Sequence, residues 1–425
     1  MYRLLLCAAA LAAAMPARAE DTELREELKI LQQRVQELES RAQQPARPQA
    51  ENALNPAVSA ILNGVYANLS RDPATYRLNG FVPTSGEVAP PPRGLSLGES
   101  ELALAANIDP MFRGTLIAAL APDTDAIGVE EAYLQTLRLP RGFTLKAGRF
   151  FSGVGYQNQI HPHAWDFTDA PLALKAFLGG QLGEDGVQLR WLAPTDMYWD
   201  LGAELGRGRA FPAAISDSGK NGFGSTSFFT HIGGDLGTGT AWQTGLSHLR
   251  TSPHERQFDD PGSGLTNSFT GSSRLWVLDG ILKWAPNRNA TYRSFKLQGE
   301  YFRRSEAGDL TRDVTAPTVG GYSSRQSGGY AQAVYQFQPQ WRAGYRYDRL
   351  SPGSSSFSGA ITAADFPILS PYSPKRHTVM VDWSPSEFSR IRLQLARDYS
   401  RAGEPDNQVF VQYIMSLGAH GAHKF

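Results

Sequence analysis

The chain has 425 residues, with 41 lysines and arginines against 41 aspartates and glutamates, so its net charge is close to zero. A balance this even argues against the basic surface that nucleic acid binding requires. The single cysteine, Cys7, lies among the first residues, so the rest of the chain can form neither a disulfide nor a cysteine-based metal site.

The amino terminus has the three parts of a secretory signal peptide. Arg3 supplies the positive charge, an apolar stretch runs from Leu4 to Met15, and Ala17-Arg18-Ala19 is a small-residue cleavage site. A membrane anchor is the alternative, but the stretch is shorter than the roughly 20 apolar residues that a spanning helix needs. We therefore expect residues 1–19 to be a signal peptide that is removed on export.

Residues 20–43 follow a helical pattern, with apolar side chains at alternating spacings of four and three: Leu24, Leu28, Leu31, Val35, Leu38 and Ala42. This pattern predicts a coiled-coil helix of about three heptads. So short a seam is marginal alone, so either it associates because a larger body oligomerises, or it is a lone solvated helix. Residues 44–56, rich in Gln, Pro, Ala and Asn, are expected to be a flexible linker.

From residue 57 to 425 the pattern changes to a period of two, in segments of strand length. Short connections with turn residues lie at 108–110, 140–142, 194–196, 237–239, 286–289, 339–340 and 385–387. They alternate with connections near 70–95, 121–126, 151–185, 207–225, 252–272, 305–328, 351–374 and 400–407. This alternation predicts an all-β transmembrane barrel of about sixteen antiparallel strands, with tight turns on one rim and long loops on the other. A soluble β-sandwich has no reason to keep it.

The two faces of the segments differ as a barrel wall requires. Apolar side chains alternate with charged or polar ones in segments 198–205, 294–301, 341–348 and 391–398, which predicts a lipid-facing exterior and a wet interior. Tryptophans near the short turns are expected to form an aromatic girdle; they are Trp242, Trp276, Trp284, Trp341 and Trp383.

Three short stretches resemble the bacterial outer-membrane porin superfamily, most closely its phosphate-selective porin-like branch. They are Glu130-Glu131-Ala132-Tyr133-Leu134, Leu145-Lys146-Ala147-Gly148-Arg149-Phe150, and the terminal Phe425 at the end of an amphipathic strand. The resemblance implies a periplasmic coiled-coil helix before a sixteen-stranded barrel, a homotrimer, an insertion signal at Phe425, and a third loop folded into the barrel. Here that loop is 151–185, whose aromatic sequence is too apolar for a solvent-washed tip.

The inward-facing ionisable residues are the nearest thing to an active site in a pore. We expect the lining and constriction to include Lys146, His161, His163, Asp166, Asp169, Arg190, Lys296, Arg342, Arg346, Arg390 and Arg392. The four arginines on 342–392 could form a basic wall facing Asp166 and Asp169 of the loop. Alternatively, these charges pair across strands and merely solvate the lumen. Acidic and basic inward positions are nearly matched, whereas a dedicated phosphate channel would be expected to show a basic excess.

Metal, cofactor and enzyme sites are not expected. The pairs His161 with His163 and His420 with His423 invite a metal hypothesis, but no inward-facing carboxylate has a ligand-like spacing to either pair. The sequence has no Gly-x-Ser-x-Gly, no His-Glu-x-x-His and no phosphate loop, and nothing singles out a catalytic set.

The sequence therefore predicts an outer-membrane porin of a Gram-negative bacterium, with its helix in the periplasm and with lipid and lipopolysaccharide around it. Small hydrophilic solutes or ions would diffuse passively through the barrel past the inward loop. The alternative is a substrate-specific uptake porin for a metal chelate or a small organic or inorganic anion. A plugged receptor with twenty-two strands would need a longer chain.

Overall fold

A computed structural model describes residues 56–84, 88–120, 127–215, 221–286 and 289–418. The signal peptide, the heptad segment, the linker up to residue 55, the pair His420 and His423, and Phe425 lie outside the described residues. Within these ranges, no helix is long and apolar enough to cross a membrane.

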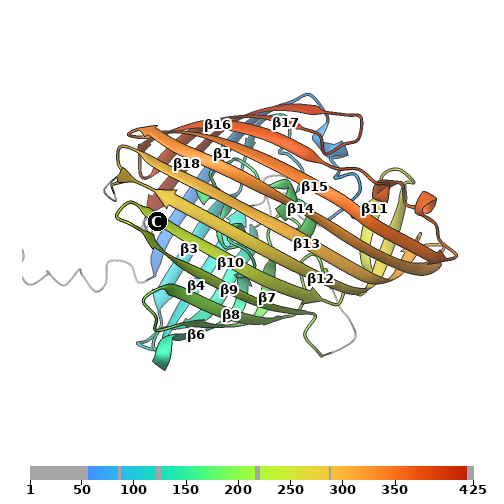
Figure 1. The fold of residues 1–425 in the computed structure, drawn as a ribbon, viewed down its shortest axis with the longest axis horizontal. Coiled ribbons are helices and arrows are strands. Elements are labelled where there is room, and N and C mark those ends of the chain that lie inside the picture. Colours follow the sequence, from blue (N-terminus) through green and yellow to red (C-terminus); the bar gives the residue numbers. More distant parts are fainter. Residues whose placement is uncertain (1–55, 85–87, 121–126, 216–220, 287–288, 419–425) are drawn as a thin grey trace, which may run out of the picture. The chain divides into compact units, whose positions relative to one another are not determined.

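The described chain forms one antiparallel sheet that closes on itself (Figure 1). In the first half its strands are β1 (Ala57–Leu69), β2 (Gly94–Leu97), β3 (Ser100–Asn107), β4 (Phe112–Leu120), β5 (Ile127–Thr136), β6 (Phe143–Phe151), β7 (Gly183–Leu192), β8 (Tyr198–Gly206) and β9 (Ser225–Leu236). In the second half they are β10 (Thr240–Thr251), β11 (Arg256–Asp260), β12 (Leu265–Trp284), β13 (Ser294–Arg312), β14 (Thr318–Gln338), β15 (Trp341–Gly359), β16 (Lys375–Ser386), β17 (Ser389–Asp398) and β18 (Asp406–Gly418).

These eighteen segments form a barrel of sixteen strands, because two of the barrel strands are each divided into two segments. Both β2 and β3 pair with β1, and both β10 and β11 pair with β12. The barrel closes where β1 pairs with β18, with Ser59 opposite Gly418. Because the number of barrel strands is even, both ends of the described barrel lie at the same rim. The predicted antiparallel barrel is confirmed.

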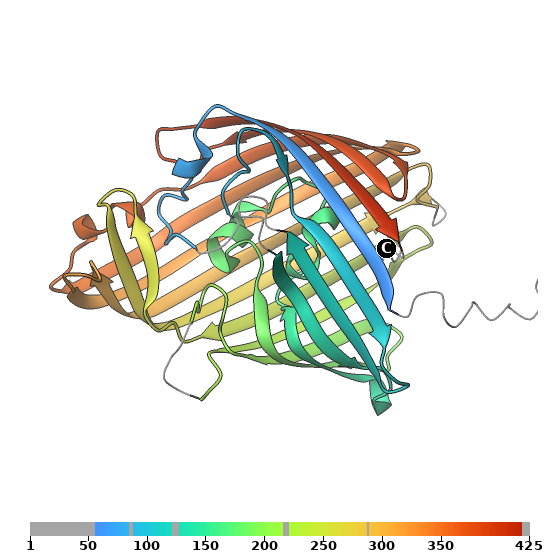
Figure 2. The same ribbon diagram turned by 180° about the vertical axis from the view of Figure 1, so that it is seen from behind.

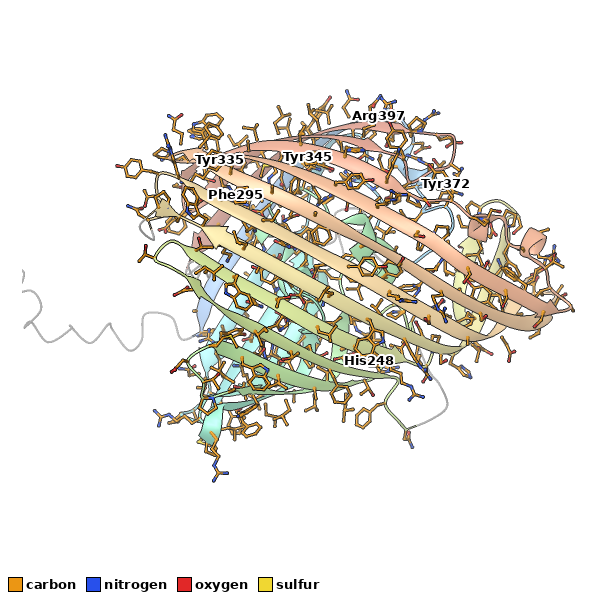
Figure 3. The ribbon with its side chains drawn as sticks, in the orientation of Figure 1. His248, Phe295, Tyr335, Tyr345, Tyr372 and Arg397 are labelled. Carbon is orange, nitrogen blue, oxygen red and sulfur yellow. The ribbon has the colours of Figure 1, made fainter. Side chains whose placement is uncertain are left out.

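The alternation of faces is confirmed as well. In β8, Trp199 and Leu205 are exposed on the outside, whereas Asp200 and Glu204 are buried inside. Aromatic side chains gather on the outer face near the rim of short turns, as Phe295 and Tyr335 do in Figure 3. Trp341 and Trp383 stack there with ring centres 6.1 Å apart. Such a girdle suits the membrane interface.

Trp276 is an exception to the girdle prediction. It lies within β12, eight residues before the end of that strand at Trp284, and its ring packs against His248, 4.4 Å between centres. At about 3.3 Å per residue, Trp276 lies well up the wall from the short turns.

Two of the predicted long loops are mostly strand. The segments 252–272 and 305–328 were expected to be loops from their Gly and Ser content, but β11 and β12 pair through the first, and β13 and β14 pair through the second up to Arg312 and Thr318. The backbone hydrogen bonds of the sheet continue past the apolar band and override the weak strand propensity of these residues. β12 to β15 are consequently the long strands of one side of the barrel (Figure 1).

The loop between β6 and β7, residues 152–182, folds into the barrel (Figure 2). It carries two 3-10 helices, η3 (Gln157–Gln159) and η4 (Pro162–Ala164), and one α-helix, α2 (Leu172–Leu178). Every residue of α2 is buried. Its apolar side chains form a hydrophobic cluster with Phe302, Tyr330 and Leu350 on the inner faces of β13, β14 and β15. The apolar composition of this loop is thus explained by packing inside the wall.

Candidate functional site in the barrel lumen

The inward loop is held by hydrogen bonds from its backbone to carboxylates of the wall. Gly153 N donates to Glu204 of β8 at 2.8 Å, and Gln157 N donates to Glu300 of β13 at 3.2 Å. Each buried carboxylate satisfies N–H groups that have no strand partner, which would otherwise be costly in a closed interior.

Helix α2 is capped at both ends by the wall. Asp348 of β15 accepts a hydrogen bond from Leu172 N at 2.9 Å, and Arg304 of β13 donates to the carbonyl of Ala176 at 3.3 Å. The negative and positive side chains match the two ends of the helix dipole. The helix then ends at Gly179, whose φ of 69° is the left-handed conformation that glycine adopts without strain.

The acidic residues of the loop meet the arginines of the wall. Arg342 of β15 lies 3.2 Å from Asp166 and 2.6 Å from Asp382, and Lys296 of β13 also pairs with Asp166. Burial opposes the ionised carboxylate, but Lys296 and Arg342 outweigh it and hold the pKa of Asp166 well below its usual range. Asp166 is therefore a buried anion fixed by two cations.

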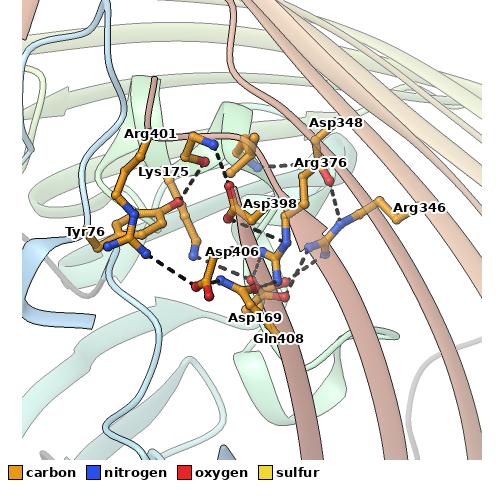
Figure 4. Close-up of polar contacts among 12 residues, drawn as sticks. Tyr76, Asp169, Lys175, Arg346, Asp348, Arg376, Asp398, Arg401, Asp406 and Gln408 are labelled. Atoms are coloured by element: carbon orange, nitrogen blue, oxygen red, sulfur yellow. Dashed lines mark hydrogen bonds and ion pairs between the residues drawn. The ribbon is translucent and has the colours of Figure 1, made fainter. Parts of the chain in front are cut away.

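Asp169 is the centre of a second group of charges (Figure 4). Arg346 lies 3.1 Å away, Lys175 of α2 lies 3.5 Å away, and Arg376 of β16 also pairs with it. Despite burial, Arg376 and Arg346 hold the pKa of Asp169 well below its usual range. Burial lowers the pKa of Lys175.

Arg390 and Arg392 of β17 contact the loop through its backbone. Both donate to the carbonyl of Trp165, at 3.4 Å and 2.8 Å. Arg392 also lies 3.5 Å from Asp382 and is fully buried, whereas Arg390 is partly exposed. The predicted contact between wall arginines and loop acids is therefore made by Arg342 with Asp166 and by Arg346 with Asp169, whereas Arg390 and Arg392 contact the loop backbone.

The two loop histidines lie against a different arc of the wall. His161 is 3.2 Å from Glu101 of β3 and 3.1 Å from Glu131 of β5, and His163 is 2.8 Å from Glu101. Burial disfavours the imidazolium, but the neighbouring carboxylates of Glu101, Glu130 and Glu131 raise the pKa of His161 well above its ordinary value. The expectation that no inward-facing carboxylate has a ligand-like spacing to this pair is wrong, because the fold brings Glu101 of β3 to both histidines.

Lys146 and Arg190 lie on the inner face but outside both groups. Lys146 stands over the ring of Tyr133, 4.3 Å from its centre. Arg190 pairs with Asp200 on the neighbouring strand, as the alternative of cross-strand pairing anticipates.

Sequence reasoning overlooked Arg376, Lys175 and Arg304 as site residues. Arg376 could have been found, because it shares the inward parity of Thr378, Met380 and Asp382. Lys175 sits in a loop helix and Arg304 in a stretch next to a supposed loop, so neither carried a signal that tied it to Asp169 or to α2.

An uncharacterized protein of Aquifex aeolicus (strain VF5) is 34% identical to the chain over 355 residues, which cover 78% of this chain and 70% of that protein. The chain belongs to the same family as this Aquifex protein. No model of a known protein family matches the sequence.

Two solved structures have a fold similar to that of this chain, at low sequence identity. OmpTdeltaL8, a loop L8 deletion mutant of OmpT, an outer membrane protein of Vibrio cholerae, has a TM-score of 0.51 at 10% identity, covering 85% of this chain and 99% of that chain. In-vitro folded OmpT of Vibrio cholerae in its trimer form has a TM-score of 0.51 at 9% identity, with the same coverage. The chain therefore has the fold of an outer-membrane β-barrel.

Proposed function

We propose that the protein is an outer-membrane channel through which small hydrophilic solutes diffuse passively, and that it prefers anions. The closed barrel, its lipid-compatible outer face and the loop 152–182 across its lumen support a channel with a narrow passage. We infer no catalytic role.

The anion preference rests on an excess of positive charge beside the loop. Five cations gather toward the rim of short turns: Lys283, Lys296, Arg342, Arg390 and Arg392. The carboxylates that pair with them are Asp166 and Asp382. Among the described residues, neither Lys283 nor Arg390 forms an ion pair with a carboxylate, and both are partly exposed. Unpaired cations that solvent reaches raise the local concentration of anions.

A planar bilayer experiment tests this proposal. Refolded protein should give discrete current steps, and in a potassium chloride gradient its reversal potential should have the sign of a chloride preference. Lys283→Glu with Arg390→Glu should move the reversal potential toward that of potassium. Arg397→Glu is the matched control, because Arg397 is exposed on the outer face of the same strand β17.

The outcomes separate the parts of the proposal. Absence of any conductance overturns the channel, and an unchanged reversal potential in the double variant overturns the role of the two cations. A current that saturates with one anion favours the second candidate, a substrate-specific anion porin as in the phosphate-selective branch. The observation in favour of that candidate is the convergence of Arg390 and Arg392 on one carbonyl, that of Trp165.

The proposal also covers how the protein assembles and where it lies. We infer a homotrimer embedded in lipid and lipopolysaccharide, with residues 20–43 as a periplasmic helix. The trimer form of Vibrio cholerae OmpT, a protein of like fold, and the heptad pattern of Leu24 to Ala42 support this inference.

A further inference from the structure

Two histidines of the inward loop and several glutamates of the wall form a compact group on the inner face of β3 and β5. Ligand atoms of Glu101, His161 and His163 all lie within 4.8 Å of one another. Glu130 adds a carboxylate oxygen 3.5 Å from Nδ1 of His161. The loop supplies both imidazoles and the wall supplies the carboxylates, so the group exists only when the loop is folded inward.

We propose that Glu101, His161 and His163 bind a divalent transition-metal ion, with Glu130 as a fourth ligand. Zinc bonds to imidazole nitrogen and carboxylate oxygen are about 2.0–2.2 Å long, so ligand atoms around one ion stand roughly 3–4 Å apart. The separations of 2.8 Å and 3.2 Å between Glu101 and the Nδ1 atoms of His163 and His161 are close to this range. Small side-chain shifts bring all three onto one ion.

The orientation of His161 supports the assignment independently. Its Nε2 faces Glu131 at 3.1 Å, and Glu131 is itself fixed by a hydrogen bond from Phe151 N at 3.0 Å. This arrangement leaves Nδ1 pointing at Glu101 and Glu130. A carboxylate behind the imidazole that holds the ring and its tautomer is the common second shell of metal-binding histidines.

Two atoms that face this space lack hydrogen bonds in the described part of the chain. They are Nδ1 of His161 and Oε2 of Glu130, both buried, which face each other at 3.5 Å without the geometry of a hydrogen bond. Buried polar atoms are normally satisfied, and a bound cation would satisfy both at once.

The charge of the group favours a divalent cation. Glu101, Glu130 and Glu131 all lie within 3.5 Å of His161, which is more negative charge than one imidazolium can balance. Imidazole with carboxylate suits zinc, nickel, cobalt or iron, whereas magnesium and calcium prefer oxygen ligands alone. The side chains of His161, His163 and Glu130 retain 15%, 10% and 18% of their exposure, so an ion from the lumen can reach them.

Such an ion would fasten residues 161–163 of the loop to β3 and β5, while Asp166 and Asp169 fasten the following residues to β13, β15 and β16. The proposed metal site does not depend on whether the barrel conducts ions, so metal binding can be measured without recording channel currents.

Isothermal titration of the refolded full-length protein in detergent with zinc chloride, after removal of metals by chelator, measures the site. We expect one ion per chain. Glu101→Gln and the double variant His161→Ala with His163→Ala should weaken binding at least tenfold, and Glu131→Gln should weaken it about 10- to 100-fold. The controls are His248→Ala, on the outer face, and His420→Ala with His423→Ala, which should bind as the unaltered protein does.

A second measurement covers variants that fold poorly. Cobalt(II) added to the unaltered protein should give visible absorption bands of nitrogen and oxygen ligation, and these should be lost in Glu101→Gln, whose folding is checked by circular dichroism and heat-modifiable migration. No zinc binding by the unaltered protein, or unweakened binding by the histidine double variant, overturns the proposal. Loss of binding only in the control His420→Ala with His423→Ala overturns it too.

Discussion

Asp169 concentrates the interactions between loop and wall in one side chain. It pairs with Arg346, Arg376 and Lys175, and its Oδ1 also accepts a hydrogen bond from the side-chain amide of Gln394 at 3.0 Å. Arg346, Arg376 and Gln394 belong to β15, β16 and β17, so one loop carboxylate contacts three neighbouring strands of the wall. A buried charge in this setting is stabilising only while all its partners are present.

Asp169→Asn should therefore destabilise the protein strongly. It removes the carboxylate and leaves three buried cations without it, which costs about 3–5 kcal/mol for a broken buried pair. Urea unfolding of the detergent-solubilised protein measures the loss. The control Asp185→Asn removes a partly exposed pair with Arg149 and should cost about 1 kcal/mol or less. Equal losses in the two variants would contradict the central role of Asp169.

Helix α2 fits the lumen because its sequence is apolar apart from Lys175, whose charge Asp169 pairs. Leu172, Leu174 and Phe177 have no exposed surface, and a helix with so much apolar surface must be enclosed. The ring of Phe177 stacks on Phe302 of β13, with centres 5.8 Å apart and planes inclined by 8°. Packing and the caps from Asp348 and Arg304 thus fix the same position.

Phe177→Ala should loosen this packing and widen the passage. Truncating a buried phenylalanine costs about 3–5 kcal/mol, and most of that loss falls on the contact between α2 and the wall. We expect larger and noisier single-channel currents. Phe295→Ala, on the outer face near the rim (Figure 3), should leave the current unchanged. A current in Phe177→Ala equal to that of the unaltered protein would show that α2 does not bound the passage.

The two sides of the barrel differ in the length of their strands. β12 to β15 are 19 to 21 residues long, whereas β3 to β6 have 8 to 10. On the outer face of β3 to β6, a shallow groove is lined by leucines and by several small residues, among them Ala106, Gly114, Ala132 and Ala147. Small residues allow close approach of membrane-embedded surfaces.

The trimer that we propose should form through this short side. Ala132→Trp fills the groove and should convert trimers to monomers, as measured by the mass of the detergent complex in light scattering. Leu297→Trp, exposed on the long strand β13, is the control and should leave the trimer intact. Monomers of the unaltered protein would contradict the trimer, and an intact trimer in Ala132→Trp would place its interface elsewhere.

Local sequence patterns were enough to predict the barrel. Apolar and polar residues alternate with a period of two, and this local pattern decides which face each side chain takes, as Asp200 beside Trp199 illustrates. Turn residues decide where each strand ends at one rim, and both signals act over a few residues. The signal peptide, the heptad helix and the role of Phe425 remain predictions, because they lie outside the described residues.

The contacts between inward side chains, by contrast, depend on the folded barrel. Parity places Glu101 and Arg376 inside, but it cannot show that loop residue His163 reaches the first while Asp169 reaches the second. These contacts join residues 62 and 207 positions apart, and they depend on strand register, on the closure of β1 against β18, and on the burial of α2. Non-local packing of this kind leaves no period in the sequence, which is why the histidine and glutamate group could not be predicted.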